Sequence, residues 1–319
     1  MLKLLKLAKF NPGFSPIFAM VLLKHHIMRK AILILLVAVL GVVPAGAEAK
    51  GKAKDRARKQ VAEKVIPSQL PVLKPVIAEY DIYVGGLHFI EARFFFREDE
   101  NRFDIRAHAR TRGFWGWMLP WRADLESQGR IEGSRFKPET HKNASTWKDE
   151  TKTIAFNYDR NQNINVVFEP SETPSEERNI VSDKEKRGAL DPLSGILQLL
   201  GDLAVNKHCW GSEPLFDGRR RFDLVGEDKG RGFTDPDEYG LYKGEARRCD
   251  VHFNMVAGEW KDRERSRFWM HKDGTPGREP FEIWLAQLSP DLPELAVRAE
   301  SPSAWGRIAV HLKGWRYAE

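Results

Sequence analysis

An alternation of apolar and polar residues recurs from Val76 to the end of the chain, and it constrains the fold more than any other feature. In its first repeat, apolar side chains occupy every second position until Gly85-Gly86 supplies a turn. Residues 90–96 and 102–110 repeat the pattern. Successive side chains of a β-strand point to opposite faces, so each repeat predicts a strand with one dry and one solvated face.

Further segments with strand character fill the rest of the chain. Turn signals such as Asp217-Gly218 and Asp273-Gly274 precede several of them. The segments are residues 121–131, 139–147, 151–159, 163–169, 219–225, 245–257, 263–271, 279–286, 294–300 and 306–317. About twelve strands of this kind predict an all-β fold with one main helix, in which a large antiparallel sheet curls into an open or spiral barrel.

The main helix is predicted over residues 191–205. Apolar residues recur there at every third or fourth position. Asp191 is a typical N-cap, and Pro192 suits the first helical position. We expect this amphipathic helix on the concave face of the sheet, where it would fill the apolar interior. Residues 170–188, which precede it, are polar and predict a loop.

The N-terminal residues are typical of an export signal. Arg29 and Lys30 precede an unbroken run of apolar or glycine residues from Ala31 to Val43, and small residues lead to Ala47. A bilayer core about 30 Å thick needs about 20 apolar residues, so a permanent transmembrane anchor is the weaker alternative. We therefore expect cleavage near Ala47, export to the periplasm and no permanent membrane span afterwards.

The chain is accordingly expected to have three parts. Residues 1–47 form an upstream extension and a signal peptide, and residues 76–319 form a single β-rich domain. Residues 48–75, rich in Lys, Arg and Pro, form a flexible basic linker between them. The true start of the chain could be Met1, Met20 or Met28.

The formal net charge of +6 comes from 51 Lys and Arg against 45 Asp and Glu. Residues 1–47 hold this entire excess, because they contain no acid. The remaining residues carry no net charge and therefore no positive field that would concentrate phosphates. We expect no nucleic-acid partner.

The chain has two cysteines, Cys209 and Cys249. In an oxidising compartment an even count predicts a disulfide. Zinc is the alternative, because His208 and His252 lie beside the cysteines. If residues 249–255 form a strand, however, His252 points away from the face of Cys249, which disfavours a shared ion. We expect a disulfide, and no metal or other cofactor.

Common catalytic and nucleotide-binding signatures are absent from the sequence, including the Gly-x-Ser-x-Gly elbow, Gly-x-x-x-x-Gly-Lys and His-Glu-x-x-His. Two acidic groups could form an acid/base pair or a calcium site: Asp124 with Glu126, and Asp235 with Asp237 and Glu238. Such groups are usually solvated surface, so we assign no catalytic residue.

The segment from Gly113 to Trp121 is unusually rich in apolar side chains for a connection between two strands. One interpretation is a loop that folds inward and caps the core. The other is a ligand site at the mouth of an apolar groove or a contact with a membrane interface, where Trp is favoured. The candidate ligand-binding residues are Phe114, Trp115, Trp117, Met118 and Trp121.

Several short motifs follow one another along the chain: Tyr80-Asp81-Ile82-Tyr83-Val84-Gly85-Gly86-Leu87, Arg112-Gly113, Asp191-Pro192-Leu193-Ser194, Phe216-Asp217-Gly218-Arg219 and Pro293-Glu294-Leu295-Ala296-Val297. In this order they resemble domain-of-unknown-function family 3108. The resemblance implies an exported protein of Gram-negative bacteria with no established activity. A more distant similarity, in fold alone, is to spiral β-proteins of envelope integrity and to lipoprotein carriers of the LolA/LolB type, which shelter acyl chains.

The export signal, the curved sheet and the Trp-rich segment together favour a non-enzymatic envelope protein. We expect it to bind a lipid, a lipoprotein or another envelope component and to support envelope integrity. A dry interior that side chains fill completely would argue against this function. The alternatives are a hydrolase that attacks envelope polysaccharide or peptide through Asp235 to Glu238, and a scaffold whose protein partners bind a sheet edge.

Overall fold

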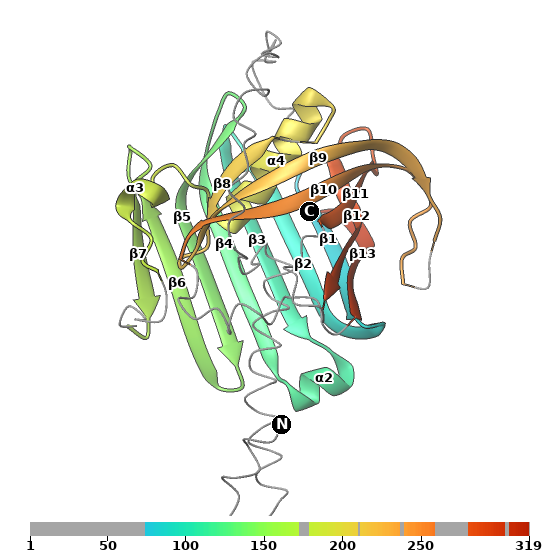
Figure 1. Ribbon diagram of the computed structural model, residues 1–319, viewed down its shortest axis with the longest axis horizontal. Coiled ribbons are helices and arrows are strands. Elements are labelled where there is room, and N and C mark those ends of the chain that lie inside the picture. The colour runs from blue at the N-terminus through green and yellow to red at the C-terminus, as the bar shows by residue number, and fades with distance from the viewer. Residues whose placement is uncertain are drawn as a thin grey trace, which may run out of the picture. The chain divides into compact units, whose positions relative to one another are not determined.

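One antiparallel sheet of 13 strands runs through the part of the chain that the structure, a computed structural model, describes (Figure 1). The described residues are 74–171, 179–209, 211–236, 239–258, 280–303 and 306–318. The strands are β1 (Val76–Val84), β2 (Leu87–Asp99), β3 (Arg102–Thr111), β4 (Trp121–Glu132), β5 (Arg135–Trp147), β6 (Glu150–Tyr158), β7 (Ile164–Glu169), β8 (Ser212–Phe216), β9 (Arg221–Thr234), β10 (Gly244–Ala257), β11 (Phe281–Gln287), β12 (Glu294–Ser303) and β13 (Gly306–Tyr317). The helices are α2 (Gly113–Met118), α3 (Asp183–Lys186) and α4 (Pro192–Asn206).

The two halves of the chain occupy the two halves of the sheet. The strand order is β7-β6-β5-β4-β3-β2-β1-β13-β12-β11-β10-β9-β8, so every neighbouring pair except β1 and β13 is consecutive in the sequence. The pairing of β1 with β13 joins the halves. The edge strands β7 and β8 do not pair with each other, so the sheet is open. The predicted fold class is confirmed.

Alternating burial follows the predicted period of two. In β4 every second residue from Trp121 to Ile131 is buried, and the residues between them are exposed. The prediction missed β8, whose five residues include Glu213 and Pro214 and are too few to show the alternation. The strand predicted at 263–271 lies outside the described residues.

Helix α4 begins and ends close to the predicted residues. The Asp191 carboxylate accepts hydrogen bonds from the backbone N–H groups of Leu193 and Ser194, each at 3.0 Å, and caps the first turn. The helix ends at Lys207, which adopts a left-handed conformation with φ 58°. Its apolar face is buried, as the 3.6-residue periodicity requires.

The sheet curves around α4. The helix contacts β3, β4 and β5 and also β8 and β12, which lie far away in the strand order (Figure 1). Leu199 and Leu203 pack with Phe222 and Val251 in one buried cluster. Gly195 permits this packing, because a Cβ atom there would lie 2.3 Å from the Leu215 side chain. The helix therefore fills the concave side, as the amphipathic pattern predicts.

Side chains bring the two ends of the sheet together. Phe156 of β6 stacks on Phe216 of β8, with ring centroids 5.4 Å apart. Leu190 forms an isolated parallel bridge with Leu215 on the outer edge of β8. Gly218 lies so close to the other end that a Cβ atom there would be 2.7 Å from Ile154. Packing, and not a continuous hydrogen-bond ladder, closes the gap.

Two segments expected as loops contain short helices. The connection after β3 forms α2, and the polar stretch at 170–188 contains α3, which Ser182 and Glu185 stabilise as a capping box. Neither helix is long enough for an apolar periodicity to be visible in the sequence. No helix within the described ranges has both the length and the hydropathy needed to cross a membrane.

Candidate functional site

Helix α2 is held tightly against the end of β3. The Thr111 hydroxyl donates to the Leu119 carbonyl at 2.8 Å and accepts from the Trp121 backbone N–H at 3.1 Å. These hydrogen bonds join the two ends of the connection that contains α2. Gly116 faces Thr111, and a Cβ atom there would lie 3.0 Å from the Thr111 carbonyl oxygen. The backbone of α2 therefore has little freedom to move its side chains away from the sheet.

The aromatic side chains of α2 divide into an exposed and a supported group. Phe114 is 63% exposed and Trp117 is 79% exposed. Trp115 is half-buried and packs on Phe89 of β2, with ring centroids 5.1 Å apart. Phe114 contacts both tryptophans, at centroid distances of 5.5 Å to Trp115 and 6.0 Å to Trp117. The result is an exposed aromatic pair on a fixed base.

The remaining predicted residues lie nearer the core. Met118 is half-buried, and Trp121 is buried, with its indole N–H donating to the Ser145 hydroxyl at 3.0 Å. The structure thus keeps four of the five candidates on α2 and places the fifth at the start of β4. The segment was interpreted either as a loop that caps the core or as an exposed contact site. Trp121 fits the first interpretation, and Phe114 and Trp117 fit the second.

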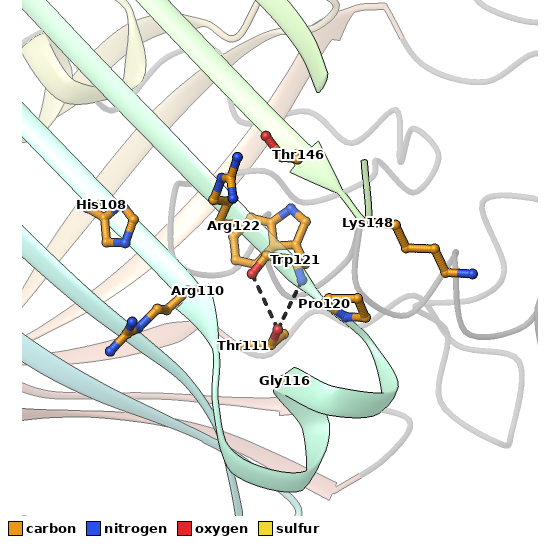
Figure 2. Close-up of a pocket in the computed structure, with 9 residues that line it drawn as sticks. All are labelled: His108, Arg110, Thr111, Gly116, Pro120, Trp121, Arg122, Thr146 and Lys148. Carbon is orange, nitrogen blue, oxygen red and sulfur yellow. Dashed lines mark hydrogen bonds between the residues drawn. The ribbon is translucent and has the colours of Figure 1, made fainter. Parts of the chain in front are cut away.

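A pocket of about 310 Å³ lies beside α2, at the ends of β3, β4 and β5 (Figure 2). The lining residues include His108 and Arg110 of β3 and Arg122 of β4, which lie on the solvent-facing side of the sheet, and Gly116 of α2. Lys148, which follows β5, is also among the lining residues. The lining includes cationic side chains and no acidic one.

Carboxylates compensate some of these cations. Glu91 of β2 bonds Arg110 at 3.1 Å and Arg112 at 2.5 Å. Burial by itself raises the pKa of Glu91, but the hydrogen bonds from Arg112 and Arg110 outweigh it and hold the pKa below its ordinary value. Asp124 lies 2.7 Å from His108. In the part of the chain that the structure describes, Arg122 has no acidic partner.

Sequence reasoning missed the basic lining of this pocket. A signal was nevertheless present: the strands predicted at 102–110 and 121–131 are consecutive, and their antiparallel pairing places Arg110 opposite Arg122. The contribution of Gly116 could not be seen, because it depends on the helix that replaces the expected loop.

The family model described as "Protein of unknown function (DUF3108)" matches residues 79–313. The chain belongs to the DUF3108 family. A solved structure described as a beta-barrel-like protein of the domain of unknown function DUF1849 from Brucella abortus is similar to it, with a TM-score of 0.41 and 12% identity over 78% of this chain and 99% of that chain. No curated protein matches. The similarity to LolA and LolB stays a prediction.

Two of the motifs that carry the family resemblance surround α4 in this DUF3108 protein. Asp191-Pro192-Leu193-Ser194 starts the helix, and Phe216-Asp217-Gly218-Arg219 forms the turn between β8 and β9. Asp217 accepts hydrogen bonds from the backbone N–H groups of Arg219 and Arg220 at 2.9 and 2.7 Å. These motifs therefore build the fold.

A buried Ser, His and Asp also meet at the start of α4. Ser127 Oγ lies 2.8 Å from His141 Nδ1 and donates to Asp191 Oδ1 at 2.6 Å, and the same Nδ1 lies 3.1 Å from Asp191 Oδ1. A hydrolytic relay needs Ser and Asp on opposite nitrogens of the imidazole. Here both residues contact Nδ1, and all three are buried. The DUF3108 protein uses this group to anchor α4.

The electrostatics of the anchor keep Asp191 ionised. Burial by itself raises its pKa, but the charge and hydrogen bond of His141, with hydrogen bonds from Ser127 and Ser194, lower it below the ordinary value. Tyr158 lies nearby, and burial raises the pKa of its phenol well above the usual value, with a smaller contribution from the Asp191 charge.

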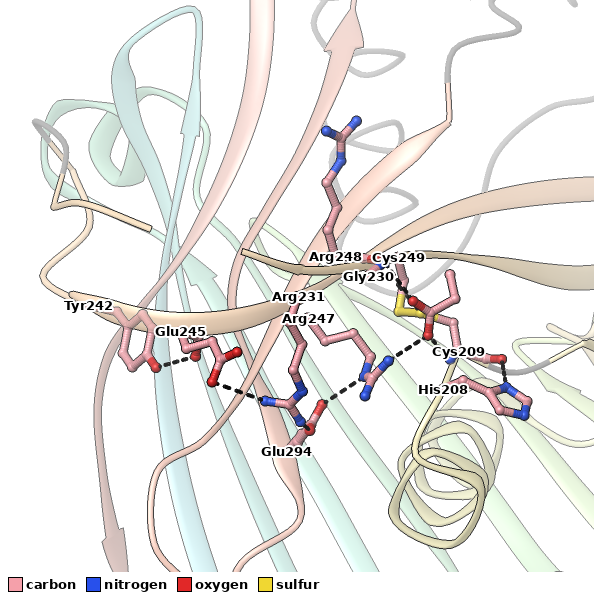
Figure 3. A network of polar contacts seen from close by, with 11 residues as sticks. His208, Cys209, Gly230, Arg231, Tyr242, Glu245, Arg247, Arg248, Cys249 and Glu294 are labelled. Carbon is pink, nitrogen blue, oxygen red and sulfur yellow. Dashed lines mark hydrogen bonds and ion pairs between the residues drawn. A yellow bond between two sulfur atoms is a disulfide. The ribbon is translucent and has the colours of Figure 1, made fainter. Parts of the chain in front are cut away.

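The structure brings Cys209 and Cys249 to disulfide-bonding distance at the end of α4 (Figure 3). The predicted face alternation is present, since Val251 packs with Cys249 in the core and His252 is outside that cluster. Asp228 accepts the Cys209 backbone N–H at 2.8 Å and bonds Arg247 at 2.7 Å. The pair is therefore embedded in a polar network that continues to β12.

The structure describes only some of the acidic residues considered for catalysis. Asp237 and Glu238 lie outside the described residues, and Asp235 is exposed. Asp124 and Glu126 lie on the solvent-facing side of β4, where Asp124 contacts His108. Within the described ranges no group of three or more His, Cys, Asp or Glu side chains is arranged to hold a metal ion.

Proposed function

We propose that this DUF3108 protein is an exported, non-enzymatic protein of the periplasm that binds an envelope lipid surface through α2. Its role would be to hold a lipid-bearing component of the envelope and so to support envelope integrity. The observation that carries the proposal is the exposed aromatic pair, Phe114 and Trp117, on a helix that is fixed to the sheet.

Aromatic side chains favour the boundary between lipid and water, where the ring is buried and polar groups stay hydrated. Burying the exposed parts of Phe114 and Trp117 contributes on the order of 3 kcal/mol in total. A gain of that size corresponds to about a hundred-fold in affinity. It supports reversible contact with a lipid surface and not permanent insertion.

A surface contact fits this molecule better than a lipid held inside the sheet. The side chains of Leu193, Leu197 and Leu203 on α4 are buried against the concave side. The same space is where an acyl chain of a LolA/LolB-type carrier would lie. An occupied concave face therefore favours the end of the sheet as the binding region.

Vesicle co-sedimentation of the mature protein tests the proposal. The Phe114→Ser/Trp117→Ser double variant is expected to bind lipid vesicles about a hundred-fold more weakly than the wild type. Phe233 at the end of β9 and Leu241 in the connection between β9 and β10, which are 66% and 78% exposed, provide the matched control. The Phe233→Ser/Leu241→Ser variant should bind like the wild type.

Two results would overturn the proposal. One is a wild-type protein that does not sediment with vesicles of any composition, and the other is an equal loss in both double variants. The export component is tested separately by N-terminal sequencing of the protein from the periplasmic fraction, which should begin directly after Ala47.

A further inference from the structure

Charge pairing along β3 and β4 has an exception next to α2. His108 lies opposite Asp124 on the neighbouring strand, as expected for a solvated sheet face. Arg110, one step nearer α2 on the same face, lies opposite Arg122. Directly opposed side chains have Cβ atoms about 4.5–5.5 Å apart, and like charges at this distance are destabilising.

The other end of the same strand pair shows how such a repulsion is compensated. Arg102 lies opposite Arg130, again two arginines. Glu139 of β5 bonds both of them, with Oε2 2.7 Å from Arg102 and Oε1 2.8 Å from Arg130. One carboxylate thus bridges the two guanidinium groups.

No carboxylate of the described residues bridges the arginines next to α2. The β5 residue opposite Arg122 is Thr146, whose hydroxyl is 2.9 Å from that of Thr151. Glu91 bonds Arg110 but lies on β2, on the side away from Arg122. At this end the basic pocket lies next to Arg110 and Arg122, and Thr146 is one of its lining residues.

We propose that this pocket binds the phosphate group of an anionic phospholipid, with Arg110 and Arg122 as its ligands. Guanidinium groups match phosphate oxygens in a bidentate geometry. A volume of about 310 Å³ accommodates a headgroup and is at the small end of ligand pockets. None of the lining residues is acidic, which favours an anionic headgroup over a zwitterionic one.

The position of the pocket fits a lipid surface contacted through α2, so this inference rests on the proposed function. Gly116 lines the pocket, while Phe114 and Trp117 project from the same short helix. In a bilayer the phosphate groups lie only a short distance above the outer acyl region. A pocket beside the exposed aromatic pair could therefore contact the phosphate groups while the aromatic side chains contact the acyl region. Stable attachment generally needs two signals, and the arginine pair would add the second to the aromatic one.

Co-sedimentation with two kinds of vesicles tests the inference. Wild-type protein should bind phosphatidylcholine vesicles containing phosphatidylglycerol more tightly than pure phosphatidylcholine vesicles. Arg122→Gln should lower binding to the anionic vesicles about five-fold, the effect of about 1 kcal/mol for one basic residue at an anionic surface. Its binding to pure phosphatidylcholine should stay close to wild type.

Arg130→Gln is the matched control, because it removes the same charge from the end that Glu139 already compensates. It should retain the preference for anionic vesicles. A second arm adds inorganic phosphate: a pocket that takes lipid phosphate should require millimolar phosphate for competition, whereas complete competition at micromolar phosphate would assign the site to the free ion and overturn the lipid assignment.

The outcomes separate the two proposals. Equal wild-type binding to both kinds of vesicles, or equal losses in Arg122→Gln and Arg130→Gln, would overturn the phosphate pocket and leave the aromatic contact standing. A wild type that binds neither kind of vesicle would overturn the proposed function itself.

Discussion

The two ends of the β3–β4 strand pair carry the same arrangement of arginines and differ in one carboxylate. Away from α2, Arg102 and Arg130 share Glu139, and the arrangement is complete within the sheet. Beside α2, Arg110 and Arg122 occupy opposed positions on neighbouring strands and both line the pocket, and only Arg110 is bonded to an acid among the described residues.

The difference teaches how a stabilising contact can be distinguished from a binding site. An arginine pair with its own carboxylate has little capacity left for an external anion. In the pair beside α2, Glu91 bonds only Arg110, so among the described residues Arg122 remains without a carboxylate and is available to an external anion beside the exposed aromatic residues. Substitutions can weaken both ends of the strand pair together or change one end at a time.

Removing the Asp191 contacts that hold α4 to the sheet should destabilise the β3–β4 strand pair at both ends. Asp191→Ala removes the helix cap and takes the carboxylate partner away from the buried His141. We expect a loss of about 3 kcal/mol in the free energy of unfolding, measured by urea denaturation. Asp191→Asn keeps much of the cap and removes only the charge, so it should lose less. Equal stability of Asp191→Ala and wild type would contradict the role of this anchor.

Removing the bridging carboxylate of Glu139 should make the end of the strand pair away from α2 resemble the end beside α2. Glu139→Gln leaves Arg102 and Arg130 opposed without compensation. All three side chains are partly exposed, so we expect a loss of about 1 kcal/mol in the free energy of unfolding. Raising the salt concentration should reduce the difference, because salt screens surface charges. A loss that does not depend on salt would argue against an electrostatic origin.

Adding a carboxylate should make the end of the strand pair beside α2 resemble the end that carries Glu139. Thr146→Glu places an acid on β5 beside Arg122, where it can extend into the pocket. We expect a loss of the preference for anionic vesicles, because the added carboxylate pairs with the arginine that would bind the lipid phosphate. Thr146→Gln has nearly the same shape without the charge and should keep the preference. If both variants lost the preference equally, steric blocking would be the cause.

The smallest expected effect is a pH dependence of stability that arises from Glu91, next to Arg110 at the end beside α2. Its pKa is lower in the folded protein than the ordinary value of 4.5, so its contribution to stability is present above pH 4.5 and is lost as the pH falls through the folded pKa. Thermal unfolding between pH 6 and pH 3 should therefore depend less on pH in Glu91→Gln than in wild type. Identical pH profiles would show that Glu91 does not stabilise the folded state.

Much of the fold could be predicted from neighbouring residues. The alternation in β4 and the N-cap at Asp191 are written in short stretches of sequence, and the structure contains both. The sequence did not reveal β8, which is short, or α2, whose six residues show no helical period. The exposed pair on α2, Phe114 and Trp117, was among the predicted ligand-binding residues. Trp121 was predicted with them, but it is buried because it begins β4.

The sequence by itself determined the elements of this protein: the all-β class, the one long helix and the aromatic composition of the connection after β3. Tertiary structure alone decided which charges meet. Arg130 reaches Glu139 across a register shift between Gln128 and Gly129, while Arg122 finds Thr146 on the same neighbouring strand. Periodicity is a local property of the chain, whereas the compensation of a charge depends on register and curvature, which bring distant residues together.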